Sequence, residues 1–340
     1  MSRTPPNKLP DRYAIQWQSY ETGRVRDISD RVTSPTLTDD SASVCTELSF
    51  QVLQATGEKF FPPLEILPGD LVSCVNTSSK ECVFFGQVQQ VSGSYRESMT
   101  ITCQDDGRLL TTNDIILQFD NVAAKTAIEQ IAAKLGIKKF SCPDLVSSVY
   151  SLEKQNAATI LQNILETVTA ENGVPYFPRM MGDTLVIRSF AETTIRAYCR
   201  QESNLASFDV MDEPGDPQVS WDIADLRNHV IVYSDMDSSV SVQAEEEDEA
   251  SIQRYGRRTA LETFSDQDTV TAAAKAKNTL LSRNKVAEEF SLTTYGSDRV
   301  CAGVRMMVDL AEIRGEFWVE AVTHDLGPPH MMTMTMRRAE

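Results

Sequence analysis

Apolar and polar residues alternate along several short stretches of the N-terminal third. Between residues 44 and 52 the even positions hold Val, Thr, Leu, Phe and Val, and the odd positions hold Cys, Glu, Ser and Gln. A period of two places each set on one face of a strand. Turn residues separate such stretches. We expect strands at 13–20, 24–28, 44–52, 71–75, 83–91 and 99–103, which predict an antiparallel sandwich or barrel over residues 11–118.

The period then changes from two to that of a helix. Apolar residues recur every three or four positions over 120–136, which predicts a helix capped by Asp120. A second helix is expected from Asn156 to Gly173, and a strand is expected at 184–187 after a glycine turn. Residues 119–190 are therefore interpreted as a small α/β insertion.

β-strand signals return after residue 190. Strands are expected at 218–221, 229–233, 290–294, 304–310, 316–322 and 331–336. One helix is expected through Leu280, capped by Ser265 or Asp266. The acidic run Glu245–Glu249 predicts a solvated loop. Residues 191–340 thus predict a second β domain with one helix.

The predicted fold class is α+β and β-dominated. Two antiparallel β-barrel or sandwich domains flank the α/β insertion, and a polar arm precedes them at residues 1–10. A chain of 340 residues has room for two or three such units. Hydrophobic residues make up 41% and charged residues 24%, which is the composition of a folded globular protein.

Charge and hydropathy exclude several partners. A net charge of -17 repels phosphate, so we expect no specific nucleic-acid binding and no attraction to anionic membrane surfaces. No apolar run approaches the roughly 20 residues of a membrane-spanning helix. The polar start is neither a secretory signal nor a membrane anchor, so we expect the chain to be made and kept in the cytoplasm.

The cysteines fit neither a disulfide framework nor a zinc site. There are seven, with no CxxC pair and wide spacing: Cys45, Cys74, Cys82, Cys103, Cys142, Cys199 and Cys301. We interpret them as reduced, mostly buried small side chains. Cys74 and Cys82 are placed to face each other across a hairpin, which leaves a disulfide there as the alternative.

The candidate catalytic and metal-binding groups are few. Of three histidines, His229, His324 and His330, the last two flank a turn and are favoured as structural residues over metal ligands, because no further ligands stand at metal-site spacing nearby. The pairs Asp39–Asp40 and Asp105–Asp106 are interpreted as turn residues, because adjacent side chains on a strand point to opposite faces.

Stacking and calcium sites are also weighed. Trp17, Trp221 and Trp318 lie in strand-like apolar contexts, which favours packing in the core or an interface over sugar or base stacking. The run Glu245–Glu249 lacks the spacing of a calcium loop. No GxSxG, phosphate-binding glycine loop or HExxH occurs. We therefore predict no catalytic, cofactor-binding or metal site.

Short motifs follow one another through nearly the whole chain. They are Asp27–Ser29 with Val32, Leu48–Val52, Pro68–Asp70 with Val72, Phe85–Val88, Trp221 through Asp225–Asn228 to Val232, Arg254–Thr259, Tyr295–Gly296, Gly303, Gly315 with Phe317–Val319, and Val322–His324 followed by His330. In this order the sequence resembles the baseplate hub proteins of contractile phage tails. The similarity is greatest to the smaller hubs of PBSX-like prophages and more distant to the late control protein D group.

The resemblance implies a non-catalytic structural subunit with two tube-like β domains. Three copies would form a pseudo-sixfold ring joining a hexameric tail tube to a trimeric spike, with baseplate wedge or LysM-type tube-initiator proteins as further partners. The insertion would lie outside, and the acidic run would line the channel or its rim. A cell-wall hydrolase and a receptor-binding tail protein are the alternatives.

Overall fold

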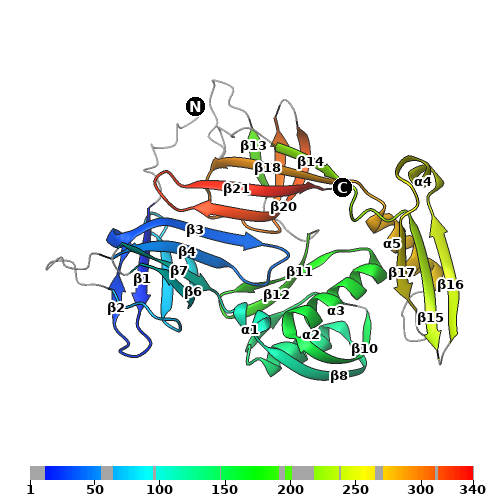
Figure 1. Ribbon diagram of the computed structural model, residues 1–340, viewed down its shortest axis with the longest axis horizontal. Coiled ribbons are helices and arrows are strands. Elements are labelled where there is room, and N and C mark those ends of the chain that lie inside the picture. The colour runs from blue at the N-terminus through cyan, green and yellow to red at the C-terminus, as the bar shows by residue number, and fades with distance from the viewer. Residues whose placement is uncertain are drawn as a thin grey trace, which may run out of the picture.

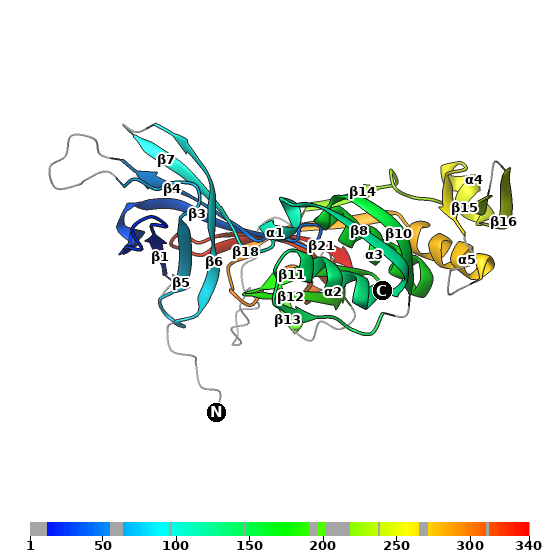
Figure 2. The ribbon, with the colours of Figure 1, turned by 90° about the horizontal axis from the view of Figure 1, so that it is seen from below.

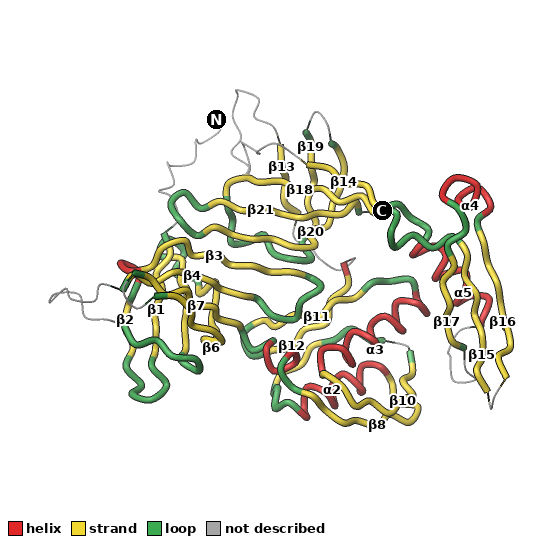
Figure 3. Tube along the Cα trace, viewed as in Figure 1, coloured by secondary structure: helices red, strands yellow, loops and turns green. Residues whose placement is uncertain are grey.

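The computed structural model describes residues 12–54, 64–94, 97–145, 147–190, 196–200, 218–236, 239–264, 271–310 and 313–339. The expected arm at residues 1–10 and the expected caps Ser265 and Asp266 lie outside this part of the chain. Strands dominate the trace, and helices gather in two places (Figure 3). The expected β-dominated α+β fold is confirmed.

The N-terminal strands form one half of a thirteen-stranded sheet, in the order β3-β4-β7-β6-β5-β1-β2 with antiparallel neighbours. The strands are β1 (Tyr13–Gln18), β2 (Val25–Asp27), β3 (Val32–Asp40), β4 (Glu47–Leu53), β5 (Leu71–Asn76), β6 (Cys82–Gly93) and β7 (Ser98–Gln104), with the short helix η1 (Ser29–Arg31) before β3. In β4 the side chains of Leu48, Phe50 and Val52 are buried, as the alternation predicts. Strand β3 was not anticipated from the sequence.

The C-terminal strands form the other half of the same sheet. Their order is β14-β18-β21-β20, and β19 pairs with β20 and with β13. The strands are β13 (Arg196–Arg200), β14 (Gln218–Asp222), β18 (Ala287–Tyr295), β19 (Arg305–Asp309), β20 (Arg314–Asp325) and β21 (Met331–Arg338). The sequence predicted these strands, except β13, to within a few residues.

The two halves join where β3 pairs with β20. The register runs from Ala321 opposite Asp40 to Asp325 opposite Thr36, and the strands are antiparallel. In Figure 1 the blue strands of the first half continue directly into the red strands of the second. We call this junction the seam. The two expected β domains are therefore edge-to-edge parts of one sheet.

The α/β insertion packs around two helices. Its elements are α1 (Arg108–Thr111), β8 (Asp114–Ala123), α2 (Ala124–Lys134), β9 (Lys139–Ser141), β10 (Ser148–Asn156), α3 (Ala157–Asn172), β11 (Tyr176–Met181) and β12 (Thr184–Ser189). Asn156 caps α3 by accepting from the amide of Ala158, and Gly173 ends it in the left-handed conformation, as predicted. Asp120, in contrast, lies within β8 and caps no helix.

The physical reason for that difference is the pairing of β8. Strand β8 pairs antiparallel with β10, and its residues Ile115 and Phe119 are buried in the insertion core. Residues 114–123 therefore adopt the two-residue period of a strand and not the helical period. The expected boundary after residue 118 consequently falls inside this strand.

A separate three-stranded sheet forms one end of the molecule, with α5 packed on one face (Figures 1 and 2). Its elements are β15 (His229–Met236), β16 (Ser239–Glu247), α4 (Glu249–Tyr255), β17 (Thr259–Thr263) and α5 (Ala272–Arg283). We call it the terminal sheet. Its strand order is β16-β15-β17.

The terminal sheet corrects two expectations. The acidic run is not a loop: Glu245–Glu247 end β16, and Asp248 caps α4 by accepting from the amide of Ser251. Strand pairing with β15 and the ion pair between Arg257 and Glu247 offset the charge repulsion that favours a solvated loop. Helix α5 begins only at Ala272, with Thr271 as its cap, and α4 is a second helix in this region.

Four clusters of buried apolar side chains make up the core. One lies in the insertion, one in each half of the large sheet, and one between α5 and the terminal sheet. The clusters are separate, so hydrogen bonds and ion pairs at the boundaries help to decide how the parts are held together. None of the helices in the described ranges is long and apolar enough to cross a bilayer.

Candidate functional sites

The histidine pair lies at the seam and is buried. His324, on β20, places Nδ1 3.0 Å from Nε2 of His330, just before β21. Nε2 of His324 is 3.0 Å from the carbonyl oxygen of Val300. Burial lowers the pKa of His324, which keeps its imidazole neutral at neutral pH. The two histidines that flank the turn thus lie against each other, and their ring nitrogens contact each other and neighbouring protein groups.

Strand β1 contributes to the same cluster. The hydroxyl of Tyr13 is 2.9 Å from Nδ1 of His330 and donates to Oδ1 of Asp298 at 2.6 Å. The amide of Asn76 donates to the other oxygen of Asp298 at 2.6 Å. Tyr13 and Asp298 are 285 residues apart, so no local pattern in the sequence points to this arrangement.

A second polar junction ties the insertion to both halves of the large sheet. Asp39, at the end of β3, pairs with Arg179 of β11 at 2.8 Å and accepts from the amide of Ala302 at 3.0 Å. The Asp39 side chain is 9% exposed and that of Arg179 is 21% exposed. Asp39 therefore lies in a strand, which corrects its interpretation as a turn residue. Asp40 bonds to the amide of Ala42 instead.

Aromatic side chains continue this junction. Phe177 of β11 packs against Gly303 so closely that a Cβ on the glycine would overlap the ring. Its ring centroid is 4.8 Å from that of Phe190, which is 5.8 Å from that of Trp318. The packing role expected for Trp318 is thus confirmed, and the insertion contacts β20 and the turn before β19 through these rings.

The partly buried carboxyl of Asp105 lies close to the same junction. Burial raises its pKa to about 6, although hydrogen bonds from Gly107 and Thr46 oppose the shift. Asp106 lies 3.5 Å from Arg108. These two acids stand in the turn before α1, as predicted.

The remaining tryptophans differ in their surroundings. Trp17 is buried, and its indole donates to Asp70 at 2.8 Å, so the core prediction is confirmed. Trp221 is 67% exposed on β14, which ends the large sheet. It belongs to none of the core clusters formed by the described residues, and a role in an interface stays a prediction.

The cysteines described with their side chains are all free: Cys45, Cys74, Cys82, Cys103, Cys142 and Cys301. Cys74 lies opposite Phe84, and Cys82 lies opposite Val75, so the two sulfurs do not face each other directly. Burial raises the pKa of the Cys74 thiol to about 12, which leaves it protonated and unreactive.

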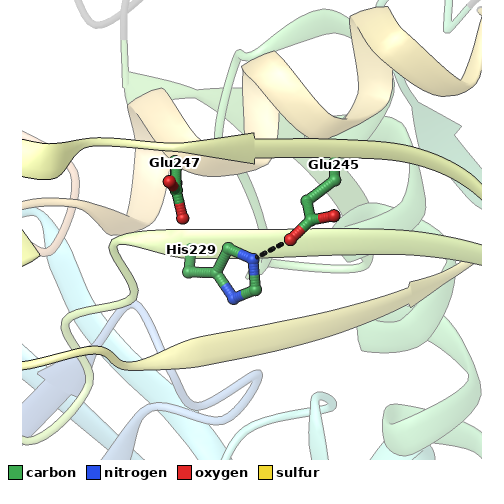
Figure 4. A group of neighbouring side chains, drawn as sticks. All are labelled: His229, Glu245 and Glu247. Carbon is green, nitrogen blue, oxygen red and sulfur yellow. Dashed lines mark hydrogen bonds and ion pairs between the residues drawn. The ribbon is translucent and has the colours of Figure 1, made fainter.

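The terminal sheet brings together a group that the sequence did not predict. Within the described ranges, the one set of three or more acidic, His or Cys side chains able to share a metal ion is His229, Glu245 and Glu247 (Figure 4). Reading the acidic run as a strand would have found it, since Glu245 and Glu247 then share a face with His229.

Each member of this group already has a partner. Nε2 of His229 is 2.6 Å from Oε1 of Glu245, its Nδ1 is 2.9 Å from the hydroxyl of Thr259, and Glu247 pairs with Arg257 at 2.8 Å. These contacts connect all three strands of the sheet. A cross-strand contact with His229 accounts for Glu245, and an ion pair with Arg257, between α4 and β17, accounts for Glu247, without a metal ion.

Comparison with solved structures places the fold. A tail protein from Neisseria meningitidis superimposes with a TM-score of 0.67 at 15% identity, covering 96% of this chain and 97% of that protein. The 43 kDa tail protein of prophage MuSo2 from Shewanella oneidensis gives 0.65 at 14%, covering 96% and 98%. The c3393 protein of E. coli gives 0.50 at 11%, covering 91% and 74%; it is described as a type VI secretion component similar to T4 tail proteins gp27 and gp5.

These matches define the class of fold as that of phage tail proteins. A search of curated proteins found no match. The YQBQ-like family matches residues 36–337, and the chain belongs to that family.

Proposed function

We propose that the chain is a structural baseplate hub subunit of a contractile tail, in a phage, a tailocin or a related injection system. Three copies form a pseudo-sixfold ring that joins the hexameric tail tube to the trimeric spike. The ring lines the central channel. Baseplate wedge or LysM-type tube-initiator proteins bind around it, and the subunit is assembled in the host cytoplasm.

One observation carries this proposal. Each chain supplies two β regions, side by side in one sheet and joined at the seam by the pairing of β3 with β20. Three such chains around an axis present six β regions, which matches the symmetry of a sixfold tube. A ring made of two-region chains is therefore a physical adapter between sixfold and threefold partners.

The position of the other parts is consistent with a ring. The insertion and the terminal sheet lie away from β1 and β2, toward the other end of the molecule (Figure 2). We place both at the periphery, and the acidic run Glu245–Glu249 at the rim of the ring. A net charge of -17 per chain gives a channel wall that is negative or neutral, because a basic wall would hold phosphate cargo.

An image reconstruction of the intact tail tip tests the proposal. We expect three copies around one axis between tube and spike, whether or not the isolated subunit is monomeric. Six copies, or a channel lined by Lys and Arg, would refute it. A mass measurement on the isolated subunit, made in parallel, separates assembly that needs partners from self-association.

The proposed role is non-catalytic. Cell-wall material cast in a gel and exposed to the purified chain is expected to show no clearing, with a known lysozyme as the positive control. A clearing zone that survives repurification would favour the alternative of a tail-associated cell-wall hydrolase. No described residue pair specifically favours that alternative or a receptor-binding role.

A further inference from the structure

In the buried cluster at the seam, the hydrogen atoms shared between the polar side chains can be assigned one by one. It consists of Tyr13 on β1, Asp298 between β18 and β19, His324 on β20 and His330 before β21. Both histidines are about 5% exposed or less. At such burial each short polar contact needs a hydrogen atom between its two heavy atoms. The donor of each bond can therefore be assigned.

The assignment starts at the carbonyl of Val300. A carbonyl oxygen only accepts, so Nε2 of His324, 3.0 Å away, carries a hydrogen. His324 is neutral, because burial lowers its pKa, so its other nitrogen has only a lone pair. That nitrogen lies 3.0 Å from Nε2 of His330. Nε2 of His330 must therefore be the donor.

The other side of His330 is fixed by Tyr13. An ionised carboxylate only accepts, and Oδ1 of Asp298 lies 2.6 Å from the Tyr13 hydroxyl, so the single hydroxyl hydrogen points to Asp298. The tyrosine oxygen then offers only lone pairs to Nδ1 of His330, 2.9 Å away. That second contact is a hydrogen bond only if Nδ1 of His330 also carries a hydrogen.

We propose that His330 is a buried proton-binding site that holds both ring hydrogens and links β1 to the last two strands through Tyr13 and Asp298. The proton comes from solvent and returns to it. With the proton bound, all four contacts are hydrogen bonds: His324 donates to the Val300 carbonyl, His330 donates to His324 and to Tyr13, and Tyr13 donates to Asp298. When it leaves, Tyr13 can satisfy either His330 or Asp298 but not both.

The charges around His330 support this assignment. The carboxylate of Asp298 does not touch His330 directly but accepts a hydrogen bond from Tyr13, which contacts His330. The side-chain amide of Asn76 donates to the second oxygen of Asp298 at 2.6 Å. Arg299, next to it, is exposed. The Cys74 thiol of β5 is kept protonated by burial, which raises its pKa, and His324 is neutral. Among the described residues, the carboxylate of Asp298 is therefore a near counter-charge for the imidazolium of His330, and the Tyr13 hydroxyl connects the two through hydrogen bonds.

The backbone holds the His330 ring in place. A Cβ at Gly296 would overlap the ring, and the Gly296 amide donates to the His330 carbonyl at 2.8 Å. The ring cannot turn away when it loses its proton, so the lost bond weakens the contact between β1 and β21. The inference stands independently of ring formation, because every residue in it belongs to one chain.

Nitrogen NMR of the full chain labelled with ¹⁵N-histidine tests the proposal. Only three histidines contribute signals, and the His330→Gln variant identifies those of His330. We expect both ring nitrogens of His330 to be protonated at pH 7, above the midpoint of about 6.5 of a free imidazole. His324 is expected to show one protonated nitrogen, Nε2.

Two variants complete the experiment. Tyr13→Phe removes the hydroxyl and is expected to lower the midpoint of the His330 titration by at least about one pH unit, a tenfold loss in proton affinity. Tyr20→Phe, an exposed tyrosine in the same hairpin, is the control and leaves the midpoint unchanged. A wild-type His330 with one protonated nitrogen at pH 7, or an unchanged midpoint in Tyr13→Phe, would overturn the proposal.

Discussion

The ion pair between Asp39 and Arg179 gives the sharpest test of how the parts are joined. Asp39→Asn removes the negative charge but keeps an oxygen that can accept from the Ala302 amide. The guanidinium of Arg179 is then left without its partner in a largely buried position. Because Asn and Asp have nearly the same size and shape, the variant measures the effect of the lost negative charge alone.

The expected cost is about 3 kcal/mol. Removing one partner of a buried ion pair typically costs about 3–5 kcal/mol, because the other charge stays desolvated. Arg179 keeps 21% of its side chain exposed, and water reaching it favours the lower end of that range. Asp40→Asn is the matched control, because Asp40 is the next residue and an Asn oxygen can still accept from Ala42. We expect it to change stability by less than about 0.5 kcal/mol.

Urea unfolding and hydrogen exchange measure the effect. The free energy of unfolding gives its size, and the amide exchange rates of β11 and β3 give its location. Adding Arg179→Met to Asp39→Asn should recover about 1–3 kcal/mol relative to the sum of the single variants, because no unpaired charge remains. If Asp39→Asn costs no more than Asp40→Asn, or the two substitutions add, the pair does not hold the insertion in place.

Four further outcomes are expected. Because burial raises the pKa of Asp105 to about 6, the folded chain binds a proton that the unfolded chain lacks between about pH 4 and 6, so the contribution of this group to stability falls as the pH rises. The free energy of unfolding of Asp105→Asn, relative to that of the wild type, should therefore rise by up to about 3 kcal/mol between pH 4 and 7. A difference between the two proteins that stays constant with pH would contradict this. Gly296→Ala should cost about 1–3 kcal/mol through overlap with His330, measured by thermal unfolding, and an unchanged melting temperature would count against it. EDTA should leave the melting temperature unchanged, because the His229 group is paired within the chain, and a clear drop would indicate a bound metal. Trp221→Ala should alter the isolated chain by less than about 0.5 kcal/mol yet reduce its incorporation into tails, and normal incorporation would remove Trp221 from the interface.

The sequence by itself determined the strands that alternate and the helices that carry clear end signals. Leu48, Phe50 and Val52 share a buried face because a strand has a period of two, and Gly173 ends α3 because it adopts the left-handed conformation without strain. The fold class followed from the same periods. Such signals act between neighbours, so they are visible without any knowledge of the rest of the chain.

Tertiary structure decided everything that depends on contacts between distant segments. Residues 114–123 became a strand because β10 pairs with them, although Asp120 is a good helix cap. Glu245–Glu247, the first part of the acidic run, became the end of a strand because they pair with β15 and Arg257 offsets part of their charge. The proton site needs Tyr13 and His330, 317 residues apart, and the insertion is held by Asp39 and Arg179. No spacing in the sequence encodes these contacts, because they join segments far apart in the chain that only the folded structure brings together.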